Sequence, residues 1–333
     1  MSSTDALMRD YSGNVPGASV LVVRNGEVAF RKSYGMADLE EQIAAAPETS
    51  YRLASVTKQF TAASILLLGI PLDDPITKYL PLPAYANAIT VRHLLTHSSG
   101  LIDYEDLIPA GTTRQVRDAD VLDLLAKQSG TYFPPGTQYR YSNGGYSLLS
   151  LIVERVSGQR FADFLRQKIF EPAGMNNSVA FEEGISTVAH RAYGYSREGG
   201  GQAILPAGQA GLPVVHWKRT DQSLTSAVLG DGGIYTSIDD LVHWIAWLEA
   251  GRFDRALVPA TRTDDPGVQY GFGWRISEHR GRTYVWHSGE TIGFRNVIVR
   301  FPSEHLAVVV LTNRNEGEPH RIALEIADRL LPR

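Results

Sequence analysis

The sequence of 333 residues contains no cysteine. Disulfide bonds, thiol nucleophiles and thiolate metal ligands are therefore excluded. No apolar run reaches the roughly 18 residues that cross a bilayer, so we expect no transmembrane segment. The first residues, MSSTDALMRDYSG, lack the apolar stretch of a signal peptide. The location of the protein stays open between the cytoplasm and export after removal of a signal.

An excess of charge of one sign is also lacking. The 32 Lys and Arg residues against 36 Asp and Glu residues give a formal net charge of −4. This balance predicts neither nucleic acid nor an anionic membrane as a partner. The chain has no G-x-S-x-G, Walker A or G-x-G-x-x-G pattern, so neither a nucleophile elbow nor a nucleotide site is predicted. We expect no cofactor.

Histidine spacing gives no metal site either. His93 and His97 are four residues apart, but the zinc pattern H-E-x-x-H requires a glutamate where this chain has Leu94. We therefore predict no metal, and we interpret His97 as a residue whose hydrogen bond fixes a loop.

Ser55 and Lys58 form the only S-x-x-K match in the chain. If the segment is helical, the two side chains lie one turn apart on the same face. A serine hydroxyl needs a neighbouring base to become a nucleophile. The apolar residues 59–68 predict a buried helix, and burial favours the neutral amine of a lysine, which can act as that base. The pair indicates a serine nucleophile, although a serine cap before a helix has the same pattern.

Tyr141 and Asn143 form a Y-x-N pattern that suits the same chemistry. A tyrosine near a cation can carry protons, and an asparagine can contact both an ammonium and a substrate carbonyl. Tyr85 and Asn87 match the pattern too. They lie in a proline-rich segment, which favours a packing role for Tyr85.

His287, Ser288 and Gly289 read H-S-G. A strand glycine lets a ligand approach the backbone closely. His287 could titrate near neutral pH and would shape, with Ser288, the electrostatics at one end of a substrate. Arg275 and Arg295 could bind a substrate carboxylate, but a solvated surface position is the interpretation that we favour for each.

In this order the three patterns resemble the motifs of the serine β-lactamase and penicillin-binding-protein superfamily. Within it the chain is most similar to the class C-like branch, which holds class C β-lactamases, D-alanyl-D-alanine carboxypeptidases, D-aminopeptidases and family VIII esterases. The stretches HLLTHSSGL, PPGTQYRYSNGGY, GDGGIYTS and YGFGW also carry the resemblance, which runs from about residue 17 to residue 313.

The resemblance implies acyl transfer through a covalent serine. It implies that Lys58 and Tyr141 together deprotonate Ser55, either of them being the immediate base. The backbone N–H groups of Ser55 and Glu290 would bind the oxyanion. Tyr141 would protonate the leaving group, and Asn143 would orient Lys58 and the substrate.

Two features depart from the pattern of the branch. Its β-lactamases resemble K-T-G where this chain has H-S-G, which indicates ester or peptide substrates rather than β-lactams. The segment at residues 69–72 is also shorter than in other members. We therefore expect a serine hydrolase that acts on a small ester or a peptide, as an esterase or a D-Ala-D-Ala carboxypeptidase or peptidase does. The alternatives are a class C-type β-lactamase and a non-catalytic penicillin-binding or scaffold module. The oligomeric state stays open.

Strand patterns lie at both ends of the chain, with helical patterns between them. Asn25 and Gly26 between residues 18–23 and 28–32 predict a hairpin with a tight turn, and residues 297–301 and 307–311 predict a second hairpin. Helices are predicted over residues 118–128, 145–156, 161–170, from Ser237 to just before Gly251, and over about 318–331. Pro172 is predicted to stop the third of them. Residues 196–213 are predicted to form a surface loop.

These patterns predict an α+β fold. An antiparallel β-sheet built from both chain ends would be flanked by helices and would carry an inserted, mostly helical region. The resemblance implies the same fold as one β-lactamase-like domain over residues 1–333. Its sheet region would cover about residues 1–60 and 230–333, its helical region about residues 61–229, and its active site would lie at the seam.

Overall fold

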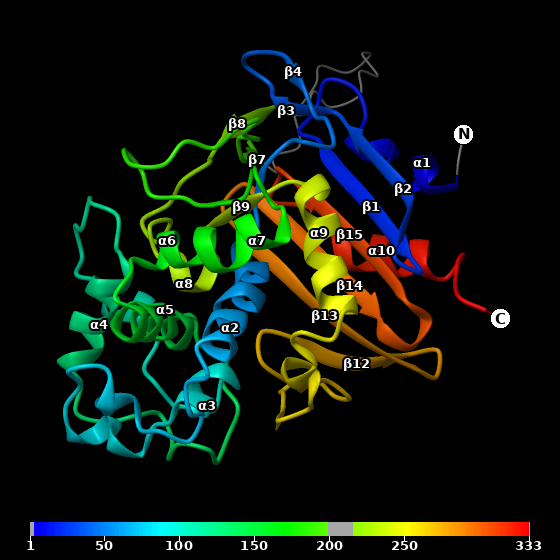
Figure 1. The fold of residues 1–333 in the computed structure, drawn as a ribbon. Coiled ribbons are helices and arrows are strands. Elements are labelled where there is room, and N and C mark those ends of the chain that lie inside the picture. Colours follow the sequence, from blue (N-terminus) through cyan, green and yellow to red (C-terminus); the bar gives the residue numbers. More distant parts are fainter. Residues whose placement is uncertain (1–2, 199–215, 333) are drawn as a thin grey trace, which may run out of the picture.

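The computed structural model describes residues 3–198 and 216–332. Within these residues, eight strands form one antiparallel sheet in the order β10-β11-β12-β13-β14-β15-β1-β2. Strands from the two chain ends pair directly, because β1 lies between β2 and β15 (Figure 1). The expected α+β fold is confirmed. The strands are β1 (Ala18–Arg24), β2 (Glu27–Tyr34), β10 (Thr261–Arg262), β11 (Gln269–Tyr270), β12 (Arg275–His279), β13 (Arg282–Thr291), β14 (Phe294–Phe301) and β15 (Leu306–Thr312).

Both predicted hairpins are confirmed. Asn25 and Gly26 connect β1 to β2 with φ angles of +53° and +79°. Positive φ at both positions gives a turn whose twist matches that of the flanking strands. β14 and β15 pair through the short turn Pro302–Glu304, where His305 also has a positive φ of +46°.

The central strands send alternate side chains into two separate cores, as the period of two of a strand requires. Val20 and Val310 lie in the core that α10 (Pro319–Ala327) covers, whereas Leu21 and Val309 lie in the larger core on the opposite face. Figure 1 shows α9 (Ile238–Glu249) over that opposite face, and α10 behind the sheet. The sheet is thereby covered on both faces.

The segment between the two ends of the sheet is mostly helical (Figure 1). The predicted helix near residue 145 begins earlier, at Asn143, because the Ser142 hydroxyl caps it by accepting from the Gly145 N–H at 3.1 Å. The cap predicted at Ser237 is confirmed by a bond from the Asp240 N–H. The remaining helices are α1 (Ser3–Leu7), α2 (Lys58–Leu67), α3 (Val91–Leu95), α4 (Asp118–Ala126), α5 (Asn143–Ser157), α6 (Phe161–Leu165), α7 (Glu171–Ala173) and α8 (Leu229–Gly232).

Two helix ends differ from the prediction. The helix after Phe161 passes through a π-helical turn, Arg166–Phe170, and continues into α7, so Pro172 does not stop it. Pro172 lies in the first turn of α7, directly after the π-helical turn. The last helix ends at Ala327 rather than Leu331, because turns follow whose N–H groups bond back to the Ala327 carbonyl.

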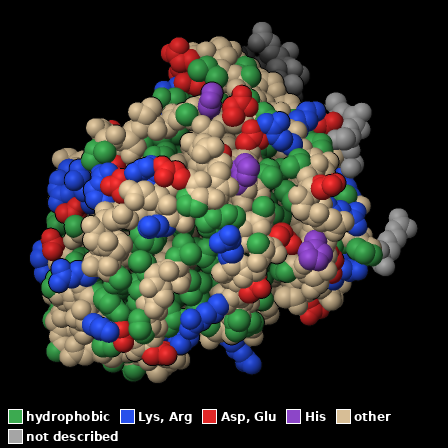
Figure 2. Space-filling model, in the orientation of Figure 1, with side chains coloured by type: hydrophobic (Ala, Val, Ile, Leu, Met, Phe, Trp, Pro, Cys, Tyr) green, Lys and Arg blue, Asp and Glu red, His purple; other side chains and the backbone are tan. Residues whose placement is uncertain are grey.

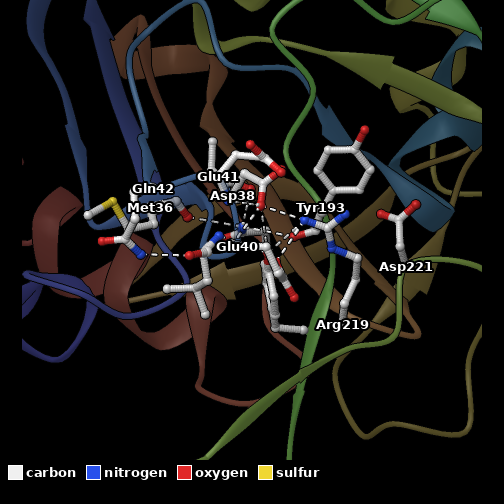
Figure 3. Close-up of polar contacts among 12 residues, drawn as sticks. Met36, Asp38, Glu40, Glu41, Gln42, Tyr193, Arg219 and Asp221 are labelled. Carbon is white, nitrogen blue, oxygen red and sulfur yellow. Dashed lines mark hydrogen bonds and ion pairs between the residues drawn. The ribbon is translucent and has the colours of Figure 1, made fainter.

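Three smaller sheets complete the described fold. An ion pair connects the β3–β4 sheet to the β7–β8 sheet. Arg219 of β8 donates to Asp38 of β3 at 2.5 Å and to Glu40 at 2.7 Å (Figure 3). The Arg219 guanidinium also stacks on the Tyr193 ring at 4.0 Å. The small sheets are β3 (Met36–Asp38) with β4 (Ile43–Ala44), β5 (Tyr51–Arg52) with β9 (Ile234–Thr236) and β6 (Val179–Ala180), and β7 (Tyr195–Arg197) with β8 (Trp217–Arg219).

The surface loop predicted at residues 196–213 begins inside β7, so the prediction is wrong for residues 196 and 197. Most of the rest of that segment lies outside the described residues. On the face shown in Figure 2, basic and acidic side chains are interspersed. No helix among residues 3–198 and 216–332 is long and apolar enough to span a bilayer.

Candidate active site

Ser55 lies at the junction between the sheet and the helical region, in a 3-10 turn, Ala54–Thr57, that runs directly into α2. The expectation of an α-helical S-x-x-K segment is therefore only partly right, since the α-helix begins at Lys58. Ala54 has a φ of +49°, a conformation that costs free energy for a residue with a side chain. This strained backbone precedes the proposed nucleophile, as is frequent at functional sites.

Lys58 is fully buried and its Nζ has three oxygen partners. Ser55 Oγ lies at 3.0 Å, Asn143 Oδ1 at 2.9 Å and the backbone carbonyl of Asp231 at 3.0 Å. These partners belong to the turn before α2, to α5 and to α8. The packing of α2 against both other helices thus assembles the amine and the hydroxyl.

Asn143 is held in one orientation by a carboxylate. Its Nδ2 donates to Glu105 Oε1 at 3.0 Å, so its Oδ1 must be the atom that faces Lys58. Glu105 lies in the 3-10 turn Tyr104–Leu107 that follows α3. The expected contact of Asn143 with Lys58 is present, and Glu105 fixes it.

Tyr141 lines the same cavity as Ser55. Its ring centroid lies 4.9 Å from Lys58 Nζ and 4.3 Å from the ring centroid of His97. His97 Nδ1 accepts from the Ser142 N–H at 3.1 Å, which confirms the interpretation that His97 fixes a loop by a hydrogen bond. The loop that it fixes carries Tyr141. Burial, followed by the nearby charge of Lys58, holds the pKa of His97 well below its usual range.

His287 is only 2% exposed, and both of its ring nitrogens have a partner within the protein. Nδ1 lies 2.6 Å from the Ser288 carbonyl, and Nε2 lies 2.8 Å from the hydroxyl of Tyr270 in β11. Burial, and after it the charge of Lys58, lowers the pKa of His287 to about 3. The expectation that His287 titrates near neutral pH is therefore wrong, because the ring is neutral throughout that range.

Gly289 brings β13 into direct contact with the turn that holds Ser55. A Cβ at this position would lie 1.9 Å from the Leu53 carbonyl oxygen and 3.2 Å from Val56 Cγ2. The close approach predicted for this glycine is thus to the protein's own backbone. It sets the spacing between Ser55 and the Glu290 backbone, the two places expected to bind the oxyanion.

The space around Ser55 is charged differently on its two sides. A cavity of ≈ 80 Å³ beside Ser55 is lined by three acidic residues, Glu105, Asp231 and Glu290, and by one basic residue, Arg52. Burial raises the pKa of Asp231 to about 7, against the opposing effect of Lys58. A second cavity of ≈ 250 Å³ is lined by Tyr141, Arg275, His287, Ser288 and Glu290 as well as Ser55.

Arg275 and Arg295 differ in how exposed their side chains are. The Arg275 side chain is 18% exposed, pairs with Asp265 at 2.8 Å and lines the cavity, so the surface interpretation is wrong for it. Arg295 is 38% exposed, as expected, and lies 3.7 Å from Glu290.

Tyr85 donates to the Leu125 carbonyl at 2.8 Å and packs against the core, which confirms its packing role.

Sequence reasoning missed three residues of the site: Glu105, Asp231 and Tyr270. Asp231 and Tyr270 lie inside GDGGIYTS and YGFGW, two stretches that carried the resemblance, and Glu105 lies four residues after the end of HLLTHSSGL. Those stretches were therefore the available signal. Within the described part of the chain, no group of three or more His, Asp or Glu side chains is arranged to hold a metal ion.

Comparisons with known proteins agree with this architecture. A family model described as Beta-lactamase matches residues 4–332. Penicillin-binding protein 4* of Bacillus subtilis is 30% identical over 94% of this chain and 72% of its own length. A D-aminopeptidase of Brucella canis is 32% identical over 98% of this chain, which spans only 61% of that relative.

Solved structures show the same fold. A penicillin-binding protein from Bacillus halodurans matches with a TM-score of 0.81 at 28% identity, over 99% of this chain and 100% of its own. An octameric penicillin-binding protein homologue from Pyrococcus abyssi matches with a TM-score of 0.80 at 26% identity, over 98% of this chain and 75% of its own. D-amino acid amidase from Ochrobactrum anthropi, at 23% identity, a TM-score of 0.79 and 98% coverage of both chains, shares the fold. The chain belongs to the Beta-lactamase family.

Proposed function

We propose that this protein is a serine hydrolase that forms an acyl-enzyme on Ser55 and cleaves peptides or amino-acid amides. The observation that carries the proposal is the position of Lys58 Nζ, 3.0 Å from Ser55 Oγ with its other two partners fixed. A buried amine in hydrogen-bond reach of a serine hydroxyl is the arrangement that activates a nucleophile.

The partners of Lys58 favour it over Tyr141 as the immediate base. A neutral amine has two N–H groups and one lone pair. Asn143 Oδ1 and the Asp231 carbonyl can only accept, so they take the two N–H groups. In that neutral form the third direction, toward Ser55 Oγ at 3.0 Å, would hold the lone pair and accept the Ser55 proton. The hydroxyl of Tyr141 bonds to no other described residue and is free to reach the substrate.

In the proposed reaction the Ser55 proton passes to Lys58 while Oγ bonds to the substrate carbonyl carbon. The backbone N–H groups of Ser55 and Glu290 receive the negative charge on the carbonyl oxygen; one such donor contributes about 2.7–4 kcal/mol elsewhere. The C–N or C–O bond then breaks, and the proton reaches the leaving group by way of Tyr141. Water repeats the sequence on the acyl-enzyme and releases the acid.

Charge around Ser55 supports a substrate with a free amino group. Glu105 and Asp231 line the small cavity and suit an ammonium, whereas Arg275 lies near Tyr141, with its guanidinium 6.0 Å from that ring centroid, on the side where the leaving group would be protonated. His287 is neutral, so the H-S-G position offers no charge to a β-lactam carboxylate. The relatives named D-aminopeptidase and D-amino acid amidase point to the same class of substrate.

The test is a panel of four substrates: D-alanine p-nitroanilide, its N-acetyl derivative, p-nitrophenyl acetate and nitrocefin. We expect kcat/KM for the free amine to exceed that for the N-acetyl compound by about tenfold or more, equivalent to about 1.4 kcal/mol. Glu105→Gln should reduce that ratio, because it removes the charge. Nitrocefin turnover near the diffusion limit of about 10⁸ M⁻¹s⁻¹ would instead identify a β-lactamase.

Ser55→Ala is the control for the nucleophile. It should abolish turnover and labelling by a fluorophosphonate probe while the unfolding temperature stays unchanged. Labelling that persists in Ser55→Ala would show that Ser55 is not the nucleophile. A ratio near one in the unmodified protein would contradict the amino-group specificity only.

A further inference from the structure

Tyr270 has a hydrogen bond that the reaction above does not use. Its ring is fully buried, and its hydroxyl lies 2.8 Å from His287 Nε2. Tyr270 ends the two-residue strand β11, which pairs with β12, so its position is set by the sheet. The His97 ring contacts it at a centroid distance of 4.5 Å.

The partners of the His287 ring determine its tautomer. A carbonyl oxygen only accepts, so the 2.6 Å contact with the Ser288 carbonyl requires a proton on Nδ1. In the neutral ring, Nε2 then carries the lone pair and accepts from the Tyr270 hydroxyl. Both nitrogens are used inside the protein, and neither is left for a substrate.

We propose that Tyr270 is a positioning residue whose hydroxyl holds His287 as the neutral Nδ1–H tautomer. Through that ring it holds the Ser288 carbonyl, two residues before the Glu290 N–H. The inference rests on the proposed function for the role of Glu290, but the tautomer itself does not. A hydrogen-bond chain from β11 thus supports the strand that presents the oxyanion donor.

The surroundings of His287 explain why the neutral form is needed. Arg275 of β12 places positive charge near the ring, and Lys58 of α2 adds another whenever its amine carries the proton, while Tyr141 and His97 face the ring from the loops beside α5 and α3. A proton on Nε2 would add a further positive charge and would lose the bond from Tyr270. Because that bond stabilises the neutral ring, its removal should raise the pKa of His287.

Tyr270→Phe tests this, with Tyr139→Phe as the matched control. Tyr139 belongs to the same aromatic cluster, 6.2 Å from Tyr270 between ring centroids, but its buried hydroxyl bonds to no described residue. In unmodified protein, ¹⁵N spectra of the histidine ring should show the Nδ1–H tautomer of His287, unchanged between pH 8 and pH 5. In Tyr270→Phe the resonance should titrate in that range.

Activity supplies a second readout. Tyr270→Phe should lower kcat on the order of tenfold, as expected for one buried hydrogen bond, with a smaller change in KM. Its activity should also fall further at acidic pH, a limb that Tyr139→Phe should not gain. A loss that is uniform across pH, with an unchanged histidine resonance, would overturn the proposal.

The outcomes separate this inference from the proposed function. The ring spectra need no turnover and can be recorded in Ser55→Ala. An Nε2–H tautomer, or titration near pH 6.5, in the unmodified protein would overturn the inference even if Tyr270→Phe failed to fold. Turnover by Ser55→Ala would contradict the proposed function and leave the tautomer result standing.

Discussion

Gly289→Ala should move β13 away from the turn that carries Ser55, and these are the two parts of the candidate active site that Gly289 brings together. The added methyl would lie 1.9 Å from the Leu53 carbonyl oxygen, whereas real Cβ atoms essentially never come within 3.0 Å of a neighbour. β13 and the turn that carries Ser55 must therefore move apart by about 1.1 Å. Gly289 has no unusual φ, so the effect comes from space alone.

Both stability and activity should respond. Overpacking of this kind costs about 1–3 kcal/mol. With about 2.1 cal/mol/K of unfolding entropy per residue over 333 residues, the unfolding temperature should fall by about 1.5–4 °C. A misplacement near 1 Å can reduce turnover by about 10²-fold, so activity should fall far more than stability.

Differential scanning calorimetry and kcat/KM with one chromogenic substrate measure the two effects. Gly130→Ala is the control, because Gly130 has an ordinary φ and a Cβ there meets nothing within 4 Å. It should leave activity unchanged and should be neutral or stabilising by about 0.4–1 kcal/mol. If Gly289→Ala kept its activity within twofold, the contact between β13 and Leu53 would not set the geometry of the site.

Three further outcomes are expected. Lys58→Ala and Tyr141→Phe should each remove most activity, and the double variant should lose little more, because groups that act as a unit are not additive; multiplicative losses would mean that they act separately. Tyr85→Phe should leave kcat/KM unchanged, and a large loss would mean that the wrong Y-x-N tyrosine is assigned. Asp38→Asn should lower the unfolding free energy by about 1–2 kcal/mol at pH 7, because burial raises the pKa of Asp38 but backbone N–H bonds and Arg219 prevail and lower it. A lowered pKa stabilises the fold above the unfolded value of about 3.9, so in urea titrations the difference between the two proteins should shrink below about pH 4; a difference that grows there would contradict the argument.

The three candidate catalytic motifs could be found from the sequence because each is local. Ser55 and Lys58 lie within one turn of chain, and Tyr141 and Asn143 are two residues apart beside a helix cap. The hairpin at Asn25 and Gly26 could be predicted for the same reason, since the turn type depends on two adjacent residues. Pro172 shows the limit of local rules, because the π-helical turn before it let the helix continue.

The state of His287 could not be predicted from its motif. An H-S-G sequence does not reveal that both ring nitrogens are engaged, one of them by Tyr270 from a different strand. The buried ring sits near Lys58 and Arg275, and that environment lowers its pKa to about 3. Charge state depends on burial and neighbours, which are properties of the folded chain.

By itself the sequence determined the α+β class, two of the hairpins, several of the helices, the candidate catalytic motifs and the resemblance to the family. Short-range geometry and side-chain chemistry suffice for these. Only the tertiary structure decided which atoms meet. Asp231 lies in a stretch that carries the resemblance, but the sequence does not show that its carbonyl contacts Lys58, because every residue has such a carbonyl and its position follows from the packing of α8 against α2. Glu105 reaches Asn143 from 38 residues away for the same reason. Contacts between distant segments depend on how the cores on both faces of the sheet pack, and packing is a property of the whole chain.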